Sequence, residues 1–300
     1  MRRALCMLAG WVLLCSAAVP ARAGGCGNGS TSRYVCGPDS YLVARDGHGR
    51  LRDFEVYLPV ALPTLRPVPL LVVLHGLANY PSDVETASGI DRLADAQGIA
   101  VAYPHALHGS WNAGTCCGPS ADAGEDDVGF LTQVVSTLAA LRPLDLRRVY
   151  VAGFSNGGML ALRAVCERPE VFAAAAAVAA TLESRCEGSQ PVSALLVNGA
   201  ADRTVPYAGS RYSSYLRTAL TPVPGAVRTL ADRSGCQHSV GDAGTVYRGL
   251  TYLGCRDGTS VRLVTLPRTD HHWPVTEHDG VDATDLVWHF LEQQVRPYAS

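Results

Sequence analysis

Residues 148–164, in the middle of the chain, limit the possible folds most strongly. Here a β-branched and aromatic run leads into a Gly-x-Ser-x-Gly turn, and a pattern typical of a buried helix follows. The order predicts that Ser155 stands at a sharp strand-to-helix corner, with its hydroxyl above the edge of a sheet. Gly153 and Gly157 leave room for a turn that Cβ atoms would obstruct. A serine that merely fills a glycine turn is the alternative, and the flanking strand and helix argue against it.

The rest of the chain repeats the alternation of strand and helix. Such alternation predicts an α/β fold, with a mostly parallel sheet covered by helices on both faces. A long Gly, Ser and Cys-rich loop is expected at 104–125, and the short gap from 180 to 192 leaves no space for a large lid. The expected strands are 51–58 (an edge strand), 69–74, 99–103, 149–152, 171–180, 192–197 and 261–266, and the expected helices are 83–97, 126–141 and the one after Ser155.

The N-terminus resembles an export signal. Arg2 and Arg3 precede an apolar stretch, residues 4–19, and a small-x-small cleavage site ends at Ala23. We therefore expect a signal peptide over 1–23 and one catalytic domain over 24–300, secreted or periplasmic. The residues before Cys26 lack the leucine usual in lipoproteins, which disfavours a lipid anchor. No other stretch is long enough to span a bilayer, so an integral membrane protein is not expected.

The cysteine count fits an exported protein. Of the 10 cysteines, two lie in the signal, leaving 10 − 2 = 8, an even number that favours disulfides. Proximity suggests Cys26 with Cys36 and Cys236 with Cys255. The other four are expected to pair among themselves in an order that stays open: Cys116, Cys117, Cys166 and Cys186. A metal or redox site at the two adjacent cysteines is the alternative, which an oxidising compartment disfavours.

Composition narrows the chemistry further. The net charge is −2 and there is no basic run, which argues against a nucleic-acid partner. All 25 basic residues are arginine, so a Ser-Lys dyad, a lysine Schiff base and a Walker lysine are excluded. A serine nucleophile must then use histidine as its base. Neither a cofactor nor a metal is expected, and the oligomeric state stays open.

A nucleophile at this corner requires an acid and a histidine later in the chain, each after a strand. Asp202 follows the strand at 192–197 and is the expected acid. His271 follows the strand at 261–266 and is preferred to its neighbour His272 as the base. Three other carboxylates remain rivals of the expected acid: Asp270, Asp279 and Asp282.

The oxyanion hole needs two backbone donors. The N–H groups of Asn156 and Leu77 are expected to supply them, and backbone donors leave the side chains at both positions nearly free to vary. His75, which ends a strand, is expected to brace this loop rather than to titrate. Trp111 and Trp273 are candidates to flank the substrate, with buried packing as the alternative for each.

Together these residues resemble the secreted α/β-hydrolase esterases of the polyhydroxybutyrate depolymerase type, a group that includes feruloyl and acetylxylan esterases. The resemblance implies the triad Ser155, Asp202 and His271. It favours His271 over His272 because the family's catalytic histidine stands two residues before the tryptophan of a Trp-Pro pair. The chain departs from the family at two points. The family usually has glycines before the catalytic histidine, where Arg268, Thr269 and Asp270 stand here, and Asn198 replaces a common histidine. The matching motifs are 69–76, 111–118, 126–130, 153–159, 198–202 with 205–207, and 271–274.

The sequence therefore predicts a secreted serine esterase whose partner is an ester substrate. The enzyme is expected to hydrolyse this ester through an acyl-enzyme intermediate. An open cleft suits polyhydroxybutyrate-type polyester or its oligomers, with feruloyl or acetylxylan esters of plant cell walls as the alternative. A serine peptidase and a non-catalytic binding protein on the same fold are the remaining hypotheses.

Overall fold

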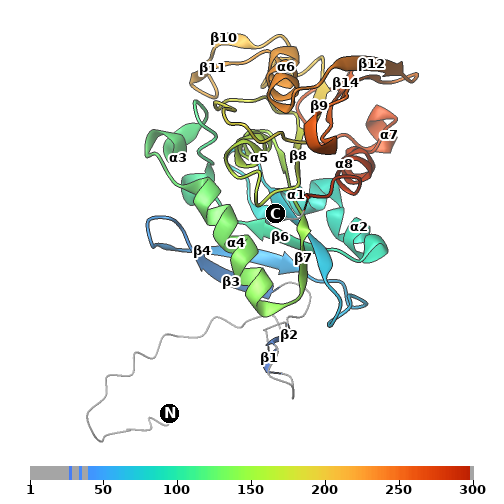
Figure 1. Ribbon diagram of the computed structural model, residues 1–300. Helices are drawn as coiled ribbons and strands as arrows, with labels where there is room; N and C mark the ends of the chain where they lie inside the picture. Colours follow the sequence, from blue (N-terminus) through green and yellow to red (C-terminus); the bar gives the residue numbers. More distant parts are fainter. Residues whose placement is uncertain (1–26, 29–33, 36–39, 298–300) are drawn as a thin grey trace, which may run out of the picture.

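The computed structural model describes residues 27–28, 34–35 and 40–297 (Figure 1). The predicted signal peptide and the predicted Cys26–Cys36 bond lie outside these residues. Within the described part of the chain, no helix is both long and apolar enough to cross a membrane.

The centre of the molecule is a ten-stranded sheet in the order β12-β13-β14-β9-β8-β7-β5-β6-β4-β3. The six strands from β14 to β6 run parallel, and antiparallel strands extend the sheet at both edges. The strands of this sheet are β3 Ser40–Arg45, β4 Leu51–Tyr57, β5 Val68–Leu74, β6 Ala100–Pro104, β7 Leu144–Phe154, β8 Ala174–Val178, β9 Ala194–Gly199, β12 His238–Ala243, β13 Arg248–Leu253 and β14 Val261–Leu266. Two small hairpins lie outside it, β1 Gly27–Asn28 with β2 Tyr34–Val35, and β10 Ser210–Ser213 with β11 Thr218–Leu220.

Helices cover both faces of the sheet, as the alternation in the sequence predicts (Figure 1). Buried side chains of α4, α5 and α6 belong to one apolar core, and those of α1, α2 and α8 belong to a second core on the opposite face. The helices are α1 Pro81–Ser88, α2 Ile90–Gln97, α3 Gly118–Asp122, α4 Asp127–Leu141, α5 Asn156–Glu167, α6 Val223–Ser234, α7 Thr276–Asp279 and α8 Ala283–Leu291.

Strand β5 shows why its sequence is apolar throughout. Leu70, Val72 and Leu74 pack into the first core, whereas Leu71 and Val73 between them pack into the second. All five are fully buried. A central parallel strand is covered on both faces, so it cannot alternate between apolar and polar residues.

Two expectations about the first third of the fold were wrong. The strand at 51–58 is β4, and it is internal rather than an edge, because it pairs with β6 on one side and β3 on the other. The edge is β3, where Tyr41 is 67% exposed. The helix expected at 83–97 is two helices, α1 and α2, separated by Gly89 in a left-handed conformation (φ 60°) that glycine adopts without a steric cost.

The sequence patterns of several other elements were too weak to predict them fully. The strand expected over 171–180 is shorter, because only Ala174–Val178 pairs with its neighbours. The hairpin of β12 and β13 extends the sheet, but every residue of β12 is exposed, so it carries no apolar alternation. The expected 104–125 loop contains a short helix, α3, and a buried stretch from Ser110 to Ala113.

The disulfides agree with the sequence. The Cys236–Cys255 bond is confirmed. The four central cysteines pair among themselves, as Cys116–Cys117 and Cys166–Cys186. The second of these bonds joins the end of α5 to the segment after β8. The first bond lies in the loop before α3, where both cysteines are buried.

Candidate active site

Ser155 occupies the corner between β7 and α5. Its backbone has φ 53° and ψ −122°, a conformation that non-glycine residues rarely adopt. The flanking glycines are sterically required, because a Cβ on Gly153 would lie 2.5 Å from the carbonyl carbon of Gly157. A Cβ on Gly157 would lie 2.4 Å from the carbonyl oxygen of His75. The turn therefore has the tight geometry that the Gly-x-Ser-x-Gly pattern indicates.

Three side chains expected from the sequence meet at the carboxyl edge of the sheet. Nε2 of His271 lies 2.9 Å from Oγ of Ser155. Nδ1 of the same ring lies 2.8 Å from Oδ2 of Asp202. When Nδ1 carries the ring proton and donates it in a hydrogen bond to the carboxylate of Asp202, Nε2 is unprotonated and can accept the serine proton.

Asp202 is held in one orientation. Its Oδ1 accepts hydrogen bonds from the backbone N–H groups of Thr204 (2.8 Å) and Val205 (2.9 Å). Its side chain is fully buried, whereas the His271 side chain is 19% exposed. The imidazole also packs against the Phe154 ring, with 4.9 Å between centroids. The histidine ring is therefore partly accessible at the surface, whereas Ser155 (4% exposed) and the carboxylate are buried.

The rival residues have other partners. His272 contacts Asp270 (2.6 Å) through Nδ1 and Asp279 (2.9 Å) through Nε2. Burial opposes its protonation, but these two hydrogen bonds raise the pKa of His272. Asp282 caps α8 by accepting the N–H of Thr284 at 2.8 Å.

The two expected oxyanion donors lie at neighbouring strand ends. Strands β5 and β7 are adjacent and parallel, with Leu74 opposite Gly153, so Leu77 and Asn156 follow at the same edge. Among the residues that the structure describes, neither backbone N–H has a hydrogen-bond partner. Two free donors at one edge are the arrangement that a developing oxyanion requires.

His75 joins the loop of Leu77 to the next loop. Its Nδ1 donates to the Gly76 carbonyl at 2.8 Å, and its Nε2 accepts the N–H of Ala106 at 3.2 Å. Burial lowers the pKa of His75 to about 4. A neutral ring in this position has the geometry expected of a brace for the loop.

Of the two alternatives for Trp111, the structure shows buried packing and not a substrate contact, because the side chain is fully buried. Its indole Nε1 donates to the His75 carbonyl at 2.9 Å. Its backbone N–H donates to Oδ1 of Asn156 at 2.7 Å, and its carbonyl accepts from Nδ2 of Asn156 at 3.0 Å. The Asn156 side chain is therefore not free to vary, contrary to the expectation from the sequence.

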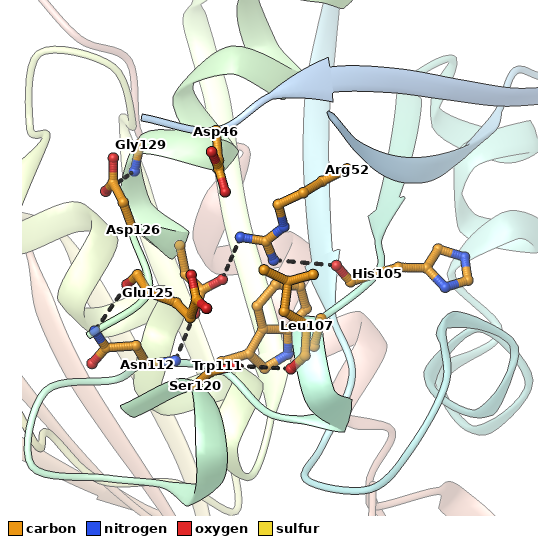
Figure 2. A network of polar contacts seen from close by, with 12 residues as sticks. Asp46, Arg52, His105, Leu107, Trp111, Asn112, Ser120, Glu125, Asp126 and Gly129 are labelled. Atoms are coloured by element: carbon orange, nitrogen blue, oxygen red, sulfur yellow. Dashed lines mark hydrogen bonds and ion pairs between the residues drawn. The ribbon is translucent and has the colours of Figure 1, made fainter. Parts of the chain in front are cut away.

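A buried ion pair supports this loop, and Figure 2 shows its arginine, Arg52, close to Trp111. Nη1 of Arg52 lies 2.7 Å from Oδ1 of Asp127, and both side chains are almost completely buried. The guanidinium stacks on the Phe130 ring, 3.9 Å from its centroid. The other oxygen of Asp127 accepts the N–H of Asn112 at 2.6 Å, one residue after Trp111. Burial raises the pKa of Asp127, and the charge of Arg52 opposes that shift.

The sequence did not reveal this network. The acidic residues at 126–127 suggest a helix cap, and Asp126 does cap α4 by accepting the N–H of Gly129 at 2.9 Å. Asp127 instead turns toward a partner far away in the chain, Arg52. The sequence feature that could have indicated the pair is Arg52, which stands at a position of β4 where the alternation places a buried residue.

Trp273 is in a different position from Trp111. It is 5% exposed, and its Nε1 donates to Oγ1 of Thr284 at 3.0 Å. It lines a pocket of about 240 Å³ together with Phe154 and His271. Trp273 therefore remains a candidate for a substrate contact.

One group among the described residues has the composition of a metal site: Asp46, His48 and Glu125, whose ligand atoms lie within 4.8 Å of one another. Arg50 already contacts both carboxylates, at 2.8 Å from Asp46 and in direct contact with Glu125. These contacts lower the pKa of Glu125. Arg50 therefore already compensates one of the two negative charges of this group.

The chain is similar in sequence to known esterases. Residues 52–217, more than half of the chain, match the family described as esterase PHB depolymerase. The putative esterase NocK of Nocardia uniformis is 36% identical over 168 residues, which cover 54% of this chain and 48% of that protein. Feruloyl esterase B of Piromyces equi is 28% identical over 260 residues, which cover 81% of this chain and 45% of that protein. The chain thus spans about half the length of these curated relatives.

The fold has solved counterparts. An acetyl xylan esterase from Aspergillus awamori superposes with a TM-score of 0.58 at 14% identity, over 84% of this chain and 99% of that one. An S-formylglutathione hydrolase from Agrobacterium tumefaciens superposes with a TM-score of 0.53 at 15% identity, over 85% of this chain and 94% of that one. The chain has the α/β-hydrolase fold and belongs to the PHB depolymerase family of esterases.

Proposed function

We propose that the protein is a carboxylic ester hydrolase in which Ser155 is the nucleophile, His271 the base and Asp202 the residue that orients the base. The observation that carries this proposal is the continuous contact from Ser155 Oγ through both nitrogens of the His271 ring to Asp202, with distances of 2.9 and 2.8 Å. Membership of an esterase family supports it independently.

The geometry suggests a double-displacement mechanism. His271 Nε2 takes the hydroxyl proton as Oγ of Ser155 attacks the ester carbonyl. The N–H groups of Leu77 and Asn156 stabilise the oxyanion that forms. The protonated imidazole then gives its proton to the leaving alcohol, and water attacks the acyl-enzyme with His271 again acting as base. The buried carboxylate of Asp202 stabilises the imidazolium in both halves.

Polyhydroxyalkanoate-type polyester or its oligomers are the proposed substrates. A relative named poly(3-hydroxyalkanoate) depolymerase C, from Paucimonas lemoignei, is 30% identical over 135 residues, 44% of this chain and 31% of that protein. Feruloyl or acetylxylan esters are the second candidate. The Piromyces equi relative supports them, as does the pocket beside Trp273, whose aromatic side chains Phe154 and Trp273 suit an aromatic acyl group.

We further propose that residues 24–300 form one catalytic domain that is exported after removal of residues 1–23. The three disulfides among the described residues support an oxidising compartment. N-terminal sequencing of the protein recovered from a culture medium or periplasm tests the cleavage site, and retention of the first 23 residues would contradict it.

The central test compares Ser155→Ala with the wild type. Turnover of p-nitrophenyl acetate should fall by about 10⁴-fold or more, with an unchanged melting temperature, and labelling by a fluorophosphonate should disappear. Retained turnover in this variant would reject the assignment. A panel of hydroxybutyrate oligomers, methyl ferulate, acetylated xylan and a prolyl amide separates the polyester, cell-wall and peptidase alternatives.

A further inference from the structure

A second pocket borders His271. It has a volume of about 400 Å³ and is lined by Ala201, Arg203, Thr204, Arg268, Asp270 and His271. Arg203 follows Asp202 directly, and Arg268 lies three residues before His271. The loops that carry the proposed acid and the proposed base thus each add an arginine to the same pocket.

The positive charge of these two arginines is not neutralised within the protein. Both side chains belong to exposed residues, and across the ranges that the structure describes neither forms a hydrogen bond or an ion pair with another residue. The carboxylate in the same pocket, Asp270, is engaged by His272 at 2.6 Å. Elsewhere the chain does neutralise arginines, for example Arg52 through Asp127 at 2.7 Å.

The pocket on the Trp273 side of His271 has a different character. Its lining combines the apolar side chains of Val84, Ala87, Phe154 and Trp273 with the polar ones of Asn79, His271 and His272, and its acidic group is Asp83. The overall charge of the chain is −2, so two unpaired cations beside His271 are a local feature and not the result of a basic protein. A concave site with an excess of one sign of charge concentrates ligands of the opposite sign.

We propose that Arg203 and Arg268 bind a free carboxylate on the substrate, so that preferred substrates are esters whose acid or alcohol part ends in a carboxylate. A guanidinium group donates two parallel hydrogen bonds to a carboxylate, and two such groups form a clamp for one. This inference rests on the proposed function, because it concerns what is bound while the ester lies at Ser155.

The position of the pocket fits a short substrate of this class. His271 lines the pocket, and its Nε2 is 2.9 Å from Ser155 Oγ, so the pocket begins one side chain away from the reacting carbonyl. In a short oligomer of a hydroxy acid, the terminal carboxylate is only a few bonds from the last ester oxygen. Such an oligomer spans the distance from Ser155 to the arginines without a long linker.

The test uses a matched pair of substrates, the dimer of 3-hydroxybutyrate as its free acid and as its methyl ester. The wild type should favour the free acid in kcat/KM by about fivefold, chiefly through KM, and this preference should shrink in 0.5 M NaCl. In the double variant R203Q/R268Q the ratio of the two kcat/KM values should fall to about one. The control is R168Q, which removes an exposed arginine at the far end of α5 and should leave the ratio unchanged.

The outcomes are distinguishable. If the wild type turns over p-nitrophenyl acetate but cleaves neither dimer, or shows no preference for the free acid, the arginine clamp is refuted while the esterase proposal stands. A preference that survives in R203Q/R268Q, or that falls equally in R168Q, also refutes the clamp. Failure of the wild type to hydrolyse any ester, p-nitrophenyl acetate included, would instead contradict the proposed function itself.

Discussion

The side chain of Asn156 is paired with the main chain of Trp111, accepting its N–H at 2.7 Å and donating to its carbonyl at 3.0 Å. Asn156 is the first residue of α5, and its own N–H is a proposed oxyanion donor. Trp111 also donates its indole N–H to the carbonyl of His75, two residues before the second proposed donor, Leu77. One buried tryptophan therefore connects the two strand ends from which the oxyanion hole is built.

Asn156→Ala should lower kcat by about tenfold or more while changing KM little. The substitution leaves the N–H of Trp111 unpaired in a buried site and leaves its carbonyl with only the N–H of Cys117, at 3.4 Å. This costs about 1 to 3 kcal/mol and frees the start of α5 to move. Affinity for a trifluoromethyl ketone, whose adduct carries an oxyanion, should fall in proportion to kcat/KM. A variant with reduced stability but wild-type kcat and wild-type affinity for this inhibitor would restrict Asn156 to a structural role.

The Arg52 guanidinium carbon lies 5.8 Å from the centroid of the Trp111 ring. Trp111→Phe should retain this packing and lose only the hydrogen bond to the His75 carbonyl. We expect a several-fold fall in kcat and a loss of about 1 kcal/mol in unfolding free energy, measured in urea. Trp288→Phe is the matched control. Trp288 is also buried, but its Nε1 has no partner among the described residues, so removing it costs no hydrogen bond. Equal effects of the two substitutions on kcat would show that the His75 contact is unimportant.

Breaking the Arg52–Asp127 ion pair should be strongly destabilising. Either Arg52→Met or Asp127→Asn leaves a buried charge uncompensated, and each should reduce the unfolding free energy by about 3 to 5 kcal/mol. The double variant should be less destabilised than the sum of the two, because no unpaired charge remains. Additive losses in a double-mutant cycle would mean that the two side chains do not interact directly.

Stability should decrease in mild acid because of His75. Burial lowers its pKa to about 4 in the folded protein, against about 6.5 in the unfolded chain. A lowered pKa means that the stabilising contribution is fully present above pH 6.5 and is lost as the pH falls toward 4. The loss should reach about 3 kcal/mol, because one pKa unit corresponds to about 1.4 kcal/mol.

The His75 contribution is isolated by a difference measurement. Melting temperatures of the wild type and His75→Gln, compared between pH 7.5 and pH 4.5, should converge as the pH falls, since glutamine does not titrate. His289→Gln serves as the control because the His289 side chain is 83% exposed. A parallel pH dependence in the wild type and His75→Gln would show that His75 stays neutral in both states or is charged in both.

Local sequence patterns predicted the elements that contribute most to the site. The corner at Ser155 needs only a strand, two glycines and a helix in immediate succession, and those constraints act over a few residues. Burial on both faces made β5 and β9 continuous apolar runs, so their ends, where Leu77 and Asp202 follow, were predictable. The edge strand, the break at Gly89 and the hairpin of β12 and β13 were missed or misread, because exposed segments carry weak hydrophobic periodicity.

By itself, the sequence determined the fold class, the corner at Ser155, and His271 and Asp202 as neighbours for it, because the order of parallel strands limits which loops can meet there. Only the tertiary structure decided that Trp111 is buried, that the Asn156 side chain is hydrogen-bonded to its main chain, and that Asp127 pairs with Arg52. The physical reason is the separation along the sequence of the residues that interact. Backbone conformation and burial leave a periodic record in the chain, whereas a hydrogen bond between residues 45 or 75 positions apart leaves none until folding brings both partners together.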